Sequence, residues 1–117
     1  MKAELKRLHS PDALDLPNWT PEGEDFAILV QVMAAPEGTP GEEAFDLTLC
    51  TPGWISSALA TEKIMMGRHL LVVSGFDYDE VLGYIAGYVA SCEGETWIEV
   101  ADKLGRLGKW EFEDYSE

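Results

Sequence analysis

The sequence predicts an α+β fold, in which a mostly antiparallel sheet of about five strands carries about three helices packed on it. Strand-like segments cluster in the first half of the chain and helical segments come later, which is typical of this class. The chain has 117 residues, of which 46% are hydrophobic, so it can fill one core without help from metals or disulfides. We therefore treat residues 1–117 as a single domain.

Three strands are expected in the N-terminal half. Residues 2–8 alternate charged and apolar side chains, and their lysines suit an edge strand. A proline-rich loop that contains Trp19 follows. Residues 26–34 and 43–50 supply two more strands, and the turn at 36–41 between them predicts a hairpin.

A helix and a further strand come next. Thr51 is the predicted N-cap of the helix, because the proline after it suits the first helical position, and the helix should end near Lys63. Its apolar side chains are expected to point toward the core: Trp54, Ile55 and Leu59. Residues 68–73 form an apolar run that predicts a central strand.

A second helix is predicted from the N-cap Asp77 to about Cys92. Gly83 and Gly87 lie one turn apart in it. Each weakens a helix by about 1 kcal/mol relative to alanine, so we expect them to permit close approach of another backbone.

The chain should finish with a third helix and a last strand. The third helix is predicted over residues 96–107, with Gly108 as its stop, and residues 110–113 alternate as a strand. An acidic tail, residues 114–117, follows.

Acidic charge is the strongest compositional signal. The chain has 22 acidic and 8 basic residues, a net charge of −14, and no lysine or arginine between Arg7 and Lys63 or between Arg68 and Lys103. Such a field repels nucleic acid and anionic membranes and attracts basic proteins. Solubility alone would also account for it.

The sequence lacks the motifs that usually carry catalysis. We find no phosphate-binding loop and no nucleophile beside a base, and the carboxylate pairs are expected to be solvated surface. Cys50, Cys92, His9 and His69 could form a metal site only if folding brought them together. Cys50 precedes a helix N-terminus, which lowers a thiol pKa, but it also ends an apolar strand, so we expect it to be buried. No catalytic residue, metal or cofactor is therefore predicted.

The cellular location is expected to be the cytoplasm. The first residues alternate charged and apolar side chains, which is unlike a secretory leader, and the longest strongly apolar run is far too short to cross a bilayer. Two isolated cysteines are typical of reduced thiols in cytosol.

Two segments combine acids with an aromatic residue in positions that should be exposed. Trp19 and Tyr78 are the aromatic residues expected nearest the surface, and such residues beside acids can anchor a basic, partly apolar protein. The candidate partner-binding residues are Trp19, Glu22, Glu24 and Asp25 in the early loop, and Asp77, Tyr78, Asp79 and Glu80 at the start of the second helix. For Asp77, stabilisation of the helix dipole is the competing role, worth about 0.3–1 kcal/mol.

The order and spacing of several short motifs over nearly the whole chain resemble the immunity protein 8 family, from bacterial polymorphic and contact-dependent toxin systems. The motifs are Met1-Lys2-Ala3-Glu4, Ser10-Pro11-Asp12, Phe45-Asp46, Cys50-Thr51-Pro52-Gly53-Trp54, Gly67-Arg68-His69-Leu70-Leu71-Val72-Val73, Asp77-Tyr78-Asp79, Gly94-Glu95-Thr96-Trp97 and Gly108-Lys109-Trp110-Glu111-Phe112-Glu113-Asp114-Tyr115.

The resemblance implies a non-enzymatic immunity protein that binds and neutralises a cognate toxin domain in the producing cell. The acidic composition agrees with a basic toxin domain as the partner. Two alternatives stay open: an acidic adaptor or nucleic-acid mimic that binds a basic housekeeping protein, and a small enzyme whose site has no familiar motif. A toxin gene immediately upstream would separate the first interpretation from the other two.

Overall fold

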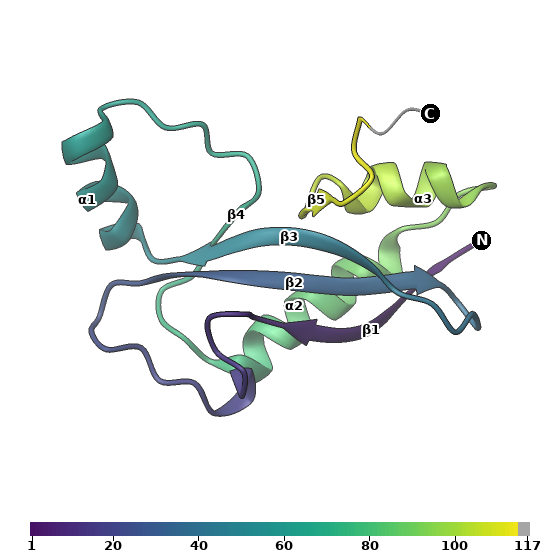
Figure 1. Ribbon diagram of the computed structural model, residues 1–117, viewed down its shortest axis with the longest axis horizontal. Helices are drawn as coiled ribbons and strands as arrows, with labels where there is room; N and C mark the ends of the chain where they lie inside the picture. The colour runs from purple at the N-terminus through teal and green to yellow at the C-terminus, as the bar shows by residue number, and fades with distance from the viewer. Residues whose placement is uncertain (115–117) are drawn as a thin grey trace.

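The computed structural model describes residues 1–114, which form a five-stranded sheet flanked by helices (Figure 1). The three longer strands, β1 (Ala3–His9), β2 (Ala27–Pro36) and β3 (Glu43–Cys50), pair as antiparallel neighbours. Two short strands share the other edge of β3. β4 (Leu70–Val72) runs parallel to its last residues, and β5 (Lys109–Trp110) runs antiparallel near its start. The predicted α+β class with a mostly antiparallel sheet is confirmed.

Three helices and one 3₁₀ turn connect these strands. The turn η1 (Leu16–Asn18) lies between β1 and β2, and α1 (Pro52–Glu62) lies between β3 and β4. α2 (Tyr78–Ser91) and α3 (Trp97–Leu104) lie between β4 and β5. In Figure 1, α2 crosses one face of the sheet, while α1 projects beyond its end.

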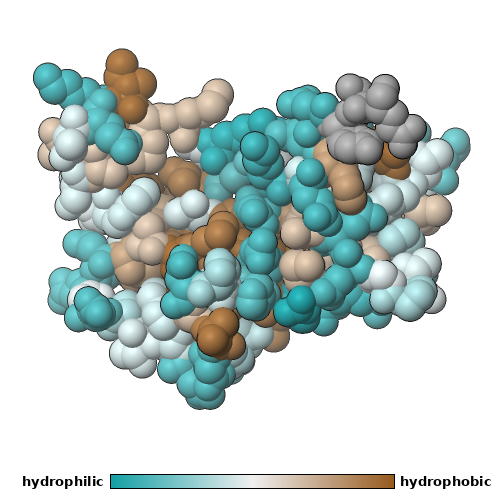
Figure 2. Space-filling model, viewed as in Figure 1, coloured by the Kyte–Doolittle hydropathy of each residue, from teal (hydrophilic) through white to brown (hydrophobic). Residues whose placement is uncertain are grey.

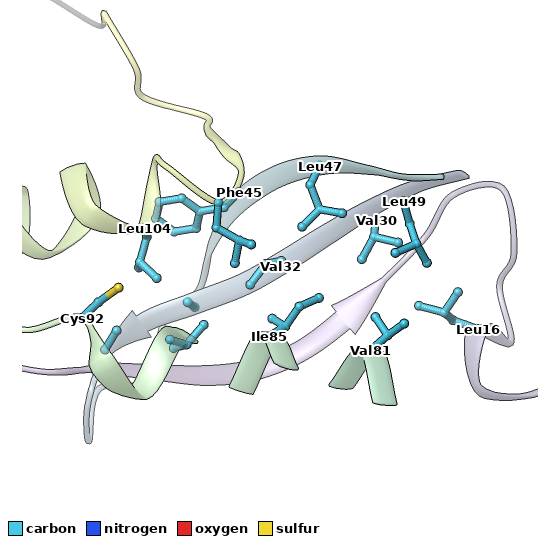
Figure 3. Close-up of a cluster of buried hydrophobic side chains, with 14 of the residues drawn as sticks. Leu16, Val30, Val32, Phe45, Leu47, Leu49, Val81, Ile85, Cys92 and Leu104 are labelled. Atoms are coloured by element: carbon cyan, nitrogen blue, oxygen red, sulfur yellow. The ribbon is translucent and has the colours of Figure 1, made fainter. Parts of the chain in front are cut away.

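The core lies between α2 and the inward faces of β2 and β3. Every second residue of these strands is buried, including Val30 and Leu47, as the hairpin prediction requires. Figure 3 shows Ile85 of α2 directed at this layer and Leu104 of α3 beside Phe45. Each such side chain contributes about 1.5–3 kcal/mol when it is fully buried.

Each of the three helices begins at a residue whose side chain caps its N-terminus. Side-chain oxygens of Thr51, Asp77 and Thr96 each accept a hydrogen bond from the backbone N–H three residues later, at 3.4, 3.2 and 3.2 Å. These bonds satisfy backbone donors that have no partner inside the helix. The predicted N-caps Thr51 and Asp77 are confirmed.

The expectation for α1 and the next strand is wrong in two respects. α1 buries none of its side chains: Leu59 is exposed, and Trp54 and Ile55 are only half-buried. The strand predicted over residues 68–73 is shorter and lies at an edge, not in the centre. The reason is topological. β4 pairs with only the last three residues of β3, so the chain that contains α1 leaves the sheet and re-enters it at the same end of β3. As a result, α1 has no sheet beside it on which to bury its apolar side chains.

The expected role of Gly83 and Gly87 is also wrong. Both residues are exposed, and a Cβ atom built at either position has no heavy atom within 4 Å. The close backbone approach occurs instead at Gly108, where a Cβ would lie 2.9 Å from the carbonyl carbon and oxygen of Phe45. The lack of a side chain at Gly108 thus allows the backbone before β5 to pass close to β3.

The C-terminal boundaries differ from the prediction as well. α3 ends at Leu104, before the expected residue 107, and turns carry the chain to β5. Only residues 109–110 pair with β3, and a turn replaces the strand predicted over 110–113. Most of the predicted acidic tail, residues 115–117, lies outside the described residues.

Candidate functional site

The two predicted contact segments meet at one end of the molecule, around the loop of residues 74–76. The indole ring of Trp19 lies 4.9 Å from the ring of Phe76 and 5.3 Å from that of Phe26, with near-perpendicular planes in both pairs. Such edge-to-face contacts are favourable. They join the early loop to the segment that leads directly into α2.

Two hollows lie on either side of this loop. One has a volume of about 440 Å³ and is lined by Glu24 and Asp25 together with residues 74–76. The other has a volume of about 390 Å³ and lies between the end of β4 and the first half of α2, with Asp77 and Glu80 in its lining. The hollows share Ser74 and Gly75. We call the two hollows and the acidic residues around them the acidic groove.

Asp25 is held in place by the start of α1. Its Oδ1 accepts a hydrogen bond of 3.2 Å from the Thr51 hydroxyl, and the same hydroxyl accepts one of 3.1 Å from the backbone N–H of Phe26. The carboxylate also lies against Gly53, where a Cβ would be 2.1 Å from Oδ1. A carboxylate at a helix N-terminus is stabilised by the helix dipole. Asp25 therefore has a structural role besides its charge.

Among the other predicted acids, Glu24 lines the first hollow, whereas Glu22 and Asp79 line neither hollow and only adjoin lining residues along the chain. Asp77 caps α2, whereas the carboxylates of Glu22, Glu24 and Asp79 form no hydrogen bond or ion pair within residues 1–114. The three ion pairs of the described chain all lie elsewhere: Lys6 with Glu4, Arg7 with Glu42, and Arg68 with Glu113. No ion pair of residues 1–114 thus balances the negative charge of the groove.

The aromatic residues of the two segments are less exposed than expected. Trp19 and Tyr78 are both half-buried and pack against the core. The exposed aromatic residues among positions 1–114 are Tyr84, which is 60% exposed and lines the second hollow, and Phe112. The expectation that Trp19 and Tyr78 are nearest the surface is therefore wrong.

Two apolar residues of the groove were missed by the sequence analysis. Val72 lines the second hollow and is 49% exposed, but it belongs to an apolar run that suggested a buried strand. Tyr84 could have been found, because on a helix it lies to one side of the stripe formed by the buried Val81, Ile85 and Val89.

The cysteines and histidines are dispersed in the structure. Cys50 and Cys92 are buried, and burial raises the pKa of each thiol, so both stay protonated at neutral pH and are poor nucleophiles. His69 lies with Nε2 2.6 Å from the carbonyl oxygen of Gly105. Within residues 1–114, no three or more His, Cys, Asp or Glu side chains are grouped as metal ligands.

A second apolar surface lies outside the groove. The connection from α1 to β4 exposes Ile64 and Met66, and Figure 2 shows hydrophobic surface at the outer end of this projection. None of the helices within residues 1–114 combines the length and the apolar character needed to cross a membrane.

Comparison with known proteins identifies the class as that of immunity proteins, which protect against toxins. The family model that matches is described as immunity protein 8, and it covers residues 3–115. The chain therefore belongs to the immunity protein 8 family. Searches of curated proteins and of solved structures found no match.

Proposed function

We propose that this chain binds the catalytic domain of a cognate toxin through the acidic groove and blocks it, in the cytoplasm of the cell that makes both proteins. Family membership supports an immunity role. The observation that carries the choice of surface is the convergence of two acidic segments, distant in sequence, on the loop of residues 74–76.

The partner that suits this surface is a basic protein domain. The net charge of −14 and the uncompensated carboxylates of the groove attract a basic surface and repel nucleic acid and anionic lipid. The proposed contact residues are Trp19, Glu22, Glu24, Asp25, Asp77, Tyr78, Asp79 and Glu80.

Inhibition is proposed to act by occupying the toxin, without chemistry by this chain. The thiols are the strongest nucleophiles the sequence offers, and their burial keeps them protonated and out of reach. Stable Cys50→Ala or Cys92→Ala variants should therefore still protect cells. Loss of protection in a folded variant would mean that a thiol takes part.

The decisive experiment is co-expression with the cognate toxin, for which a toxin gene immediately upstream of this one would be the first candidate. The wild-type chain should keep cells alive, and the double variant Glu24→Lys/Asp79→Lys should protect less. A matched control reverses the same number of charges at Glu37 and Glu95, which lie by the N-terminus at the opposite end of α2. α2 has 14 residues and is therefore about 21 Å long, so the control positions lie a helix length away from the groove.

Each outcome has a clear meaning. If cells with the wild-type chain die as fast as cells without it, the immunity proposal is wrong. If the wild type protects but the groove variant and the control variant protect equally well, the function stands and the chosen face is wrong. An acidic adaptor for a housekeeping protein would instead retain a basic host protein and give no protection.

A further inference from the structure

β4 is an edge strand whose outer backbone groups have no partner strand. The His69 carbonyl accepts a hydrogen bond of 2.9 Å from the Thr48 N–H, and the Val73 N–H donates one of 2.8 Å to the Cys50 carbonyl. Because these groups point toward β3, the alternation of a strand directs the N–H and C=O of Val72 away from it. No strand of residues 1–114 pairs on that side.

The second hollow of the acidic groove runs beside this open edge. Its lining combines the apolar side chains of Leu71, Val72, Val73, Val81 and Tyr84 with the carboxylates of Asp77 and Glu80. An extended peptide beside β4 could pair with its backbone, place apolar side chains in the hollow and bring basic side chains to the carboxylates. A helix would leave the Val72 groups unpaired.

We propose that an extended segment of the toxin domain, with apolar and basic side chains, adds to the sheet as a strand next to β4. This proposal rests on the proposed function and specifies how the partner is held. A second copy of this chain is a poor occupant, because it carries the same net charge of −14 and would bring acids against acids.

The test removes one backbone donor and leaves the side-chain surface largely in place. Val72→Pro deletes the outward N–H, and proline is tolerated at such an edge position because the ladder to β3 does not use that group. The matched control Val72→Ala trims the side chain but keeps the N–H. Circular dichroism and thermal unfolding would establish that both variants keep the wild-type fold.

Affinity for the purified toxin domain is the main measurement. Losing one backbone hydrogen bond and leaving its acceptor on the toxin unpaired should raise the Kd of Val72→Pro about tenfold over wild type, whereas Val72→Ala should change it less than about threefold. Tyr84→Ala lies on the exposed side of α2, outside the sheet, and should weaken binding by a similar factor even if the proline variant does not fold.

Hydrogen exchange of the wild-type chain gives an independent result without any substitution. The amide of Val72 should exchange rapidly in the free protein and at least about tenfold more slowly in the complex, as expected for a new ladder bond. Unchanged exchange at residues 70–75 on binding, or equal losses in Val72→Pro and Val72→Ala, would overturn the strand-pairing proposal and leave the immunity function intact. A wild-type chain that does not bind the toxin domain, or that binds only itself, would overturn both.

Discussion

Replacing Gly83 and Gly87 by alanine should stabilise the protein. Both residues lie in the interior of α2, and a Cβ at either position meets no heavy atom within 4 Å. Glycine in a helix costs about 0.5–1 kcal/mol relative to alanine, because the unfolded chain gives up more backbone freedom. The double variant should therefore gain about 1–2 kcal/mol in free energy of unfolding.

The assay is urea unfolding followed by tryptophan fluorescence, together with thermal unfolding. For a chain of this size, the gain corresponds to an increase in Tm of roughly 4–10 °C. Gly108→Ala is the control of opposite sign. Its Cβ would lie 2.9 Å from the carbonyl of Phe45 and 3.2 Å from the N–H nitrogen of Asp46. These are backbone atoms that cannot rotate away, so stability should fall by about 1–3 kcal/mol.

The prediction is wrong if the two sets of glycine substitutions do not change the free energy of unfolding in opposite directions. A double alanine variant no more stable than wild type would mean that the outer face of α2 is not open in the free protein. A neutral Gly108→Ala would mean that β3 and the chain before β5 are not in close contact.

Three further predictions concern the cap of α1, alkaline pH and association kinetics. Thr51→Ala should lower the free energy of unfolding by about 2 kcal/mol, because it removes a helix cap and leaves the buried backbone N–H of Phe26 unpaired. Thr51→Ser keeps the hydroxyl and should retain most of the wild-type stability. Urea titration distinguishes the two variants. Burial raises the pKa of Cys50 and Cys92 in the folded protein, whereas the thiols of the unfolded chain keep the ordinary pKa of about 8.5. Their contribution to stability is therefore complete below that pH. Above it the contribution is lost, because the unfolded chain releases its thiol protons first and is thereby favoured. The free energy of unfolding should fall as pH rises past that value, and less steeply in the Cys→Ala double variant; an equal slope in both would exclude the thiols as the cause. In stopped-flow mixing with the toxin domain, the association rate should fall strongly from low salt to 1 M. Glu24→Lys should lower this rate more than Glu37→Lys does. A rate independent of salt would mean that the negative charge serves solubility.

Local features of the fold were predictable from the sequence because they depend on neighbouring residues. Thr51 and Asp77 could be identified as caps, and the bounds of β3 could be stated to the residue, since each rests on a short-range pattern. The family resemblance, now supported by the match over residues 3–115, also rested on such local motifs.

Features that depend on distant contacts could not be predicted in the same way. The apolar run around Val72 indicates a strand, but only the pairing of β4 with the end of β3 decides that it lies at an edge. The two contact segments were chosen separately for their acids and aromatics. Their meeting at Phe76 depends on the packing of Trp19, which no spacing in the sequence reveals.

The acidic groove combines forces of two different ranges. Carboxylates without a partner among residues 1–114, such as Glu24 and Asp79, act on a basic protein over a Debye length of about 10 Å at 0.1 M salt. The open edge at Val72 and the ring of Tyr84 act only after contact, through a backbone hydrogen bond and apolar burial. On the proposed function, the charges would therefore set how quickly the toxin is captured and the edge strand how slowly it is released. An inhibitor made in the same cell as its toxin needs both, because a toxin molecule that escapes either step can act on the cell.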